Sequence, residues 1–113
     1  MRLETEKHFN RLNPAQAERI AMLMEEAGEI VQACGKVLRH GYESHNPNDA
    51  QSSSNRHHLH KEIRDIEAII EMMRSAHDLS GVQPATVTET IRKKMRYTHH
   101  QEAALASLTE ASE

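Results

Sequence analysis

The length and composition of the chain predict one small domain with a thin hydrophobic core. It has 113 residues, 37% of them hydrophobic, and its only aromatic residues are one Phe and two Tyr, so we expect oligomerisation to complete the core. The net charge of −3 excludes a global basic field that would recruit polymeric nucleic acid or an anionic membrane. Because no apolar run is long enough to span a bilayer and no signal segment begins the chain, we expect a cytoplasmic protein.

The first predicted helix runs from Pro14 to about Arg39. Asn13 precedes it as the N-cap, Pro14 takes the first helical position, and Gly41 stops the helix. Hydrophobic residues recur along it at helical spacing, and we expect this apolar stripe to face the core. The apolar stripe consists of Ile20, Leu23, Met24, Ala27, Ile30, Val31, Cys34 and Leu38. Cys34, the single cysteine, is therefore expected to be a buried hydrophobe.

Three glutamates crowd the side of this helix that lies roughly opposite to the apolar stripe. They are Glu25, Glu26 and Glu29, and no basic residue lies three or four positions from any of them. Like charges at these spacings destabilise a helix by about 0.2–0.5 kcal/mol per pair, so the crowding indicates a missing cation. Because Met22 and Ala33 share the acidic side, we expect the helix to pack on two faces, as in a bundle.

A polar loop and a second helix follow. Residues 41 to 56 are rich in Gly, Pro, Asn, Asp and Ser, and a loop of this length is typical of a mobile or functional segment. The second helix is predicted from His57 to Leu79. Its apolar side consists of Leu59, Ile63, Ile66, Ile69, Ile70 and Met73. Glu62 falls inside that side and Asp65 at its edge, and a buried carboxylate needs a metal ion or a base as its partner.

The five carboxylates of the two helices together predict a site for a divalent metal ion. Oxygen ligands at this density suit Mg²⁺ or Mn²⁺ and not zinc. A solvated acidic face is the competing interpretation, since Glu-rich helices are common and Lys61 can pair with Asp65 one turn away. Two histidine clusters, at 57–60 and 99–100, are interpreted as surface histidines, because no cysteine and no HExxH turn accompanies them.

A third helix is predicted from Val87 to about His100. Thr86 and Glu89 have the spacing of a capping box at its start. Its basic stretch consists of Lys93, Lys94 and Arg96, followed by Tyr97. This stretch is interpreted either as a solvated helical face or as a set of phosphate contacts. Residues 101–113 are expected to extend the helix or to form a disordered tail.

The acidic motifs resemble those of a known protein family. The string MEEAGEIVQACGKVLRHG, followed by HKEIRDIEAII, is similar to the EExxE and ExxD signature of the MazG-like, all-α nucleoside triphosphate pyrophosphohydrolases, especially their small phage-type members. The similarity covers roughly residues 14–100, and the interval between the two motifs is longer than in many relatives. It implies an all-α fold with one domain over residues 1–100, a bundle of about four helices completed in a homodimer or homotetramer.

The resemblance also implies a reaction and a set of site residues. The family hydrolyses nucleoside triphosphates between the α and β phosphates, to a monophosphate and pyrophosphate, which implies nucleotide-pool control here. By the same resemblance the Mg²⁺ ligands are Glu26, Glu29, Glu62 and Asp65. Glu25 is then the group that activates the water or supports the ligands. The proposed contacts to the outgoing pyrophosphate are Lys93, Lys94 and Arg96, with Tyr97 against the sugar or base.

A non-catalytic helical interaction module is the alternative to an enzyme. In that interpretation the acidic face docks a basic partner and any bound metal is incidental. Pyrophosphate release from nucleoside triphosphates, with and without Mg²⁺, distinguishes the two. The sequence is compatible with a ribose or a deoxyribose substrate, with any base, and with an alarmone such as ppGpp.

Overall fold

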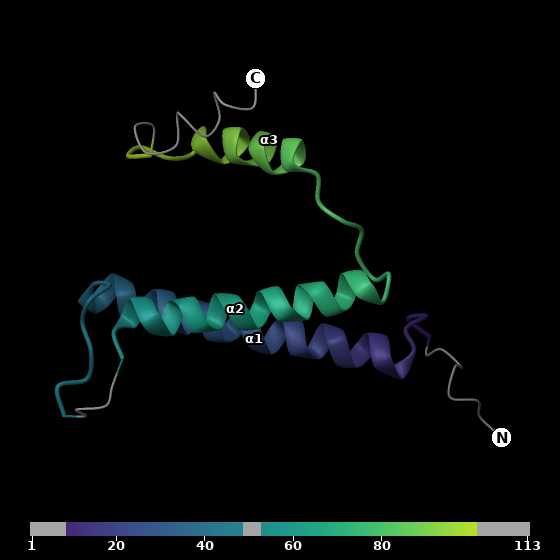
Figure 1. Cartoon of the computed structure of the whole chain (residues 1–113), viewed down its shortest axis with the longest axis horizontal. Helices are drawn as coiled ribbons and strands as arrows, with labels where there is room; N and C mark the ends of the chain where they lie inside the picture. The colour runs from purple at the N-terminus through teal and green to yellow at the C-terminus, as the bar shows by residue number, and fades with distance from the viewer. Residues whose placement is uncertain (1–8, 49–52, 102–113) are drawn as a thin grey trace. The chain divides into compact units, whose positions relative to one another are not determined.

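A computed structural model describes residues 9–48 and 53–101 and contains three helices. They are α1 (Pro14–His40), α2 (Asn55–Ser75) and α3 (Pro84–Met95), and no strand occurs in the described residues, which confirms the all-α class. The chain divides into two compact units, residues 1–79 and 80–113. In the first unit α1 and α2 lie side by side and run in opposite directions (Figure 1). None of the described helices is long and apolar enough to cross a membrane.

The bounds of α1 agree closely with the prediction. The side chain of Asn13 accepts a hydrogen bond from the backbone N–H of Gln16 at 2.8 Å, and the side chain of Gln16 accepts one from the N–H of Asn13 at 2.9 Å. This reciprocal capping box satisfies two N–H groups that a helix start otherwise leaves without a partner. At the other end Gly41 has φ 84°, which glycine adopts without strain, and its N–H donates to the carbonyl of Val37.

Helix α2 begins two residues and ends four residues earlier than predicted. Ser54 caps its start by accepting a hydrogen bond from the N–H of His57. After Ser75, His77 adopts φ 64°, and the N–H of Asp78 donates to the carbonyl of Met73 at 2.8 Å. This turn directs Asp78 to the guanidinium of Arg19 on α1, at 2.5 and 3.1 Å. This ion pair joins α1 to the turn that follows α2.

The hydrophobic core of the first unit is small, and it lies on a different side of α1 from the one predicted. Its buried hydrophobic residues are Ala33 from α1 and Ile69 and Met73 from α2. Most of the apolar side predicted for α2 is buried or half-buried, whereas the apolar stripe of α1 is largely exposed. Val31 is 72% and Leu38 87% exposed. The prediction that the apolar stripe faces the core is wrong, because periodicity shows which residues share a side and not what covers it.

Two related predictions are also settled by this packing. Cys34 is exposed and not buried, because it belongs to the stripe that α2 leaves uncovered. The side of α1 that contacts α2 instead carries Met22, Ala33 and the two glutamates Glu26 and Glu29, all buried or half-buried. Packing of α1 through its acidic side, expected from the sequence, is therefore present within the first unit.

Helix α3 belongs to the second unit and starts earlier than predicted. Pro84 occupies its first turn and Gln83 is the N-cap, without a side-chain capping bond. The predicted capping box of Thr86 and Glu89 is wrong, because the fixed φ of Pro84 already begins the helix upstream. Glu89 instead pairs with Arg92 at 3.2 Å. The helix ends at Met95, five residues before His100, and residues 102–113 of the predicted tail lie outside the described residues.

Candidate metal centre

Four carboxylates meet in the interface between α1 and α2. Each residue offers an oxygen, and these four oxygens all lie within 4.8 Å of one another. This acidic cluster consists of Glu26 and Glu29 on α1 and of Glu62 and Asp65 on α2. Both pairs have a spacing of three residues, so each helix presents two carboxylates on one side. The structure thus brings together the four residues that the family resemblance implies as metal ligands. Metal binding itself stays a prediction.

The acidic cluster is partly withdrawn from water, since all four of its residues are half-buried. The side chain of Glu62 is 14% exposed and that of Asp65 is 40% exposed. Two oxygens, Glu26 Oε2 and Glu62 Oε2, are enclosed and have no hydrogen-bond partner in the described residues. A buried polar atom without a partner destabilises a fold by about 1–3 kcal/mol, and more when charged. The arrangement therefore leaves acceptor oxygens directed into a space where a cation would satisfy them.

Crowding of negative charge also changes the acidity of the cluster. A hydrogen bond with Glu62, then the negative charges of Glu26 and Glu62, raise the pKa of Glu29 from 4.5 to about 7. Near neutral pH this carboxyl group is therefore only partly ionised, because repulsion opposes a further negative charge. A bound cation and a bound proton are the two ways of relieving that repulsion.

One basic side chain contacts the cluster at its rim. The Nζ atom of Lys61 lies 3.0 Å from Asp65 Oδ2 and 3.7 Å from Glu62 Oε1. The hydrogen bond to Asp65, and then the nearby negative charges, raise the pKa of Lys61. The pair predicted between Lys61 and Asp65 is confirmed. A single ammonium group that is 61% exposed cannot neutralise four carboxylates, so it does not replace a cation inside the cluster.

The other predicted site residues lie outside the cluster. Glu25 is exposed on α1 and is not one of the four grouped carboxylates. The proposed phosphate and sugar contacts belong to the second unit. Lys93 and Lys94 occupy the last turn of α3, Arg96 caps it, and Tyr97 is 85% exposed. None of the described histidines joins the acidic cluster, and the surface position predicted for His57, His58 and His60 is confirmed.

A small cavity beside the cluster is lined in part by residues that were not predicted as site residues from the sequence. Its volume is about 290 Å³, and it is lined by Glu29, Gln32, Ala33, Lys36, His58, Lys61 and Glu62. Lys36 lies two helical turns beyond Glu29, and His58 lies one turn before Glu62, so both are on the same helix sides as the carboxylates. That spacing is the signal that identifies them.

Comparison with known proteins gives no further assignment. No model of a protein family, no curated protein and no solved structure matches the chain.

Proposed function

We propose that the chain is a Mg²⁺-dependent nucleoside triphosphate pyrophosphohydrolase that cleaves between the α and β phosphates, in a cytoplasmic nucleotide-pool role. The observation that carries the proposal is the acidic cluster, in which four carboxylates from two helices lie within 4.8 Å. Two of their oxygens are enclosed and without a partner in the described residues. An all-oxygen donor set fits Mg²⁺, with Mn²⁺ as a substitute.

Each part of the site has a task in this proposal. The acidic cluster holds Mg²⁺, which when bound supplies positive charge to phosphate oxygens and makes water more acidic. Glu25, one residue before Glu26 and exposed, accepts the proton of the attacking water. Lys61 is already beside the cluster and can pair with a phosphate oxygen in place of Asp65.

The burial of the carboxylates disfavours the alternative of a non-catalytic interaction module. A docking face for a basic partner needs accessible charge, yet the side chain of Glu62 is 14% exposed. Glu26 and Glu29 are half-buried between the helices. Asp65 has a more exposed side chain than Glu62, but it is already paired with Lys61. Most of the negative charge therefore points into the α1–α2 interface and not toward a partner.

Pyrophosphate release tests the enzymatic proposal directly. Full-length protein is stripped of metal and incubated with a panel of ribonucleoside and deoxyribonucleoside triphosphates and with ppGpp, with and without Mg²⁺. We expect release from at least one triphosphate only when Mg²⁺ is present, and loss of release in Asp65→Asn. Glu67→Gln is the matched control, because it removes an exposed carboxylate of α2 outside the cluster. Absence of release from every substrate would reject the proposal.

The exposed apolar stripe supports a second part of the proposal, that the protein is a homodimer or homotetramer. Met24, Val31 and Leu38 are each more than two-thirds exposed, at 71%, 72% and 87%. Exposed apolar residues gathered on one helix side indicate an interface. Two α1–α2 hairpins joined through this stripe give the bundle of four helices that the sequence predicts. Sedimentation at micromolar concentration should show at least a dimer, and a fully active monomer would contradict it.

A further inference from the structure

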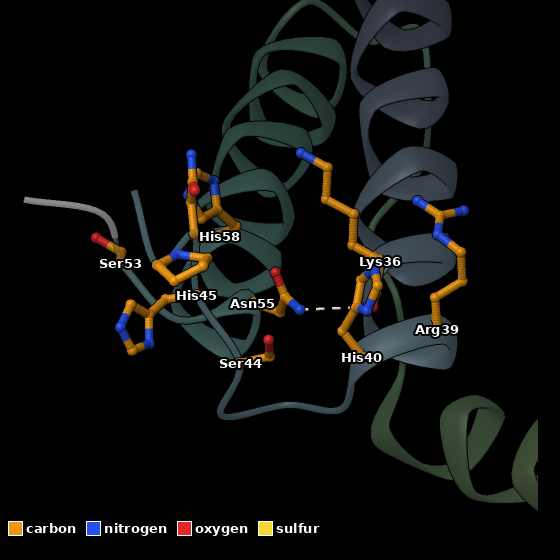
Figure 2. A pocket seen from close by; sticks show the side chains of 10 residues that line it. Lys36, Arg39, His40, Ser44, His45, Ser53, Asn55 and His58 are labelled. Atoms are coloured by element: carbon orange, nitrogen blue, oxygen red, sulfur yellow. Dashed lines mark hydrogen bonds between the residues drawn. The ribbon is translucent and has the colours of Figure 1, made fainter. Parts of the chain in front are cut away.

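A second cavity, lined by basic residues, adjoins the acidic cluster. It has a volume of about 370 Å³ and lies between the end of α1, the loop that follows and the start of α2 (Figure 2). No Asp or Glu is among the described residues that line it. This basic pocket is defined by Lys36, Arg39, His40, His45, Asn55 and His58.

No acidic side chain among the described residues neutralises the positive charge of the basic pocket. Neither Lys36 nor Arg39 forms an ion pair with another described residue, whereas Arg19, Arg56, Lys61 and Arg92 all do. Figure 2 shows Lys36 extending from α1 toward α2, with His45 and Ser53 on the other side of the pocket. The cationic side chains of Lys36 and Arg39 make the pocket attractive to an anion.

The walls of the basic pocket are held in place by hydrogen bonds between the loop and α2. The side-chain amide of Asn55 donates to the carbonyl of Gly41 at 3.1 Å and to that of Lys36 at 3.4 Å, and its backbone N–H donates to Ser44 at 2.8 Å. The N–H groups of Arg56 and His57 are also occupied. Because these N–H groups of the first turn of α2 already have acceptors, an anion in the pocket binds to side chains.

The basic pocket and the acidic cluster share part of their walls. Lys36 and His58 line the basic pocket and also the smaller cavity that contains Glu29 and Glu62. A ligand that spans both therefore needs a part that reaches a metal ion at the carboxylates and an anionic part that reaches Lys36. A chain of phosphates meets both requirements, since its oxygens bind Mg²⁺ and accept hydrogen bonds from Lys and Arg.

We propose that the basic pocket binds the terminal phosphates of a nucleoside polyphosphate whose α-phosphate lies at the acidic cluster. This inference rests on the proposed function, and it moves the contacts to the leaving pyrophosphate from the α3 residues to Lys36 and Arg39. The volume of 370 Å³ is near the lower end of the range of about 300–1,000 Å³ for small-molecule sites. The described lining offers Lys36 and Arg39 and no carboxylate, so we expect binding at this site to depend on the number of phosphates.

Calorimetric titration with inorganic pyrophosphate tests the pocket without requiring turnover. Full-length wild type is compared, with Mg²⁺ present, with Lys36→Ala, Arg39→Ala and Arg39→Gln. Loss of a charge-assisted contact should raise the dissociation constant about tenfold or more in each variant. The charge-matched control is Arg64→Ala, which removes an exposed cation of α2 that does not line the pocket and should change the constant less than about twofold.

The outcomes separate failure of the pocket from failure of the enzyme. Wild-type affinity in Lys36→Ala and Arg39→Ala, or an equal loss in Arg64→Ala, would overturn the pocket even if triphosphates are hydrolysed. Displacement of pyrophosphate by a short oligonucleotide at equal phosphate concentration would also overturn it, because the pocket would then bind a phosphodiester backbone. If pyrophosphate binds through Lys36 and Arg39 but no triphosphate is cleaved, the proposed reaction fails and the anion site stands.

Discussion

The side of α1 that packs against α2 carries carboxylates, whereas the side that remains exposed carries the apolar stripe. Glu26 and Glu29 are half-buried on the side that packs against α2. Val31 and Leu38, on the apolar stripe, are 72% and 87% exposed. A small helical domain ordinarily buries its apolar residues and exposes its charged ones. Both sides of α1 are therefore unfavourable in an isolated, metal-free chain, and each would be stabilised by a different kind of partner.

The difference indicates which partner each side needs. The acidic side has enclosed oxygens without hydrogen-bond partners in the described residues, so a cation relieves it. The apolar stripe has no polar group to satisfy, so another protein surface relieves it. We therefore assign metal binding and oligomerisation to roughly opposite sides of one helix. Substitutions that act on one side and leave the other intact can test this division.

The largest effect should come from the acidic side, in Glu62→Gln. We expect Mg²⁺-dependent pyrophosphate release below about one-thousandth of wild type, equivalent to roughly 4 kcal/mol of transition-state stabilisation. Without metal the same variant should melt a few degrees higher than wild type, because one enclosed negative charge is gone. Melting curves with and without Mg²⁺ measure this reversal. A variant less stable than wild type in metal-free buffer would show that the carboxylate has a structural partner instead.

Glu25→Gln should have the next largest effect and should separate metal binding from proton transfer. Glu25 is exposed and outside the acidic cluster, so its amide variant should keep the rise in melting temperature caused by Mg²⁺. A lost general base should lower the turnover number about a hundredfold. Single-turnover hydrolysis alongside metal titration measures the two effects. Hydrolysis at the wild-type rate would transfer the role of base to another group.

The substitution Val31→Glu in the apolar stripe should weaken oligomerisation and leave metal binding unchanged. In a monomer a substitution at this exposed position changes stability by less than about 0.5 kcal/mol. Within a dimer it places a charge in an apolar interface, so the dissociation constant should rise about tenfold or more. Sedimentation equilibrium measures this shift. Ala21→Glu, an exposed position of α1 outside the stripe, is the control, and equal sedimentation of both variants would place the interface elsewhere.

The two sides of α1 also show how far the sequence predicts the structure. Asn13, Pro14 and Gly41 fix the ends of α1 through local capping rules, and these ends are correct. Spacing on the two helices indicated a cluster of five carboxylates that included Glu25, and the family resemblance implied the set of four that the structure groups. The exposure of the apolar stripe did not follow, because the sequence does not show which side of α1 the second helix covers and an exposed stripe contradicts the ordinary preference for apolar contact.

The second limit of the sequence concerns interactions that join distant residues. The ion pair of Arg19 and Asp78 joins α1 to the turn after α2, and its partners are 59 positions apart in the chain. Lys36 and His58 meet only because the loop returns α2 alongside α1. Local patterns carry no information about such long-range contacts, so the basic pocket required the structure.

The smallest predicted effect is a pH dependence that belongs to the acidic side alone. The pKa of Glu29 is raised from 4.5 to about 7 by a hydrogen bond with Glu62 and by the charges of Glu26 and Glu62. The folded, metal-free protein therefore binds more protons than the unfolded chain between those two pH values. Stability falls as the pH rises through that window, and the loss is complete above a pH of about 7. Glu29→Gln should flatten the dependence of melting temperature on pH in metal-free buffer, and saturating Mg²⁺ should do the same in wild type by replacing the proton. Val31→Glu, which changes only the apolar stripe, should keep the wild-type slope. A wild-type slope in Glu29→Gln would show that the destabilising repulsion is not at this cluster.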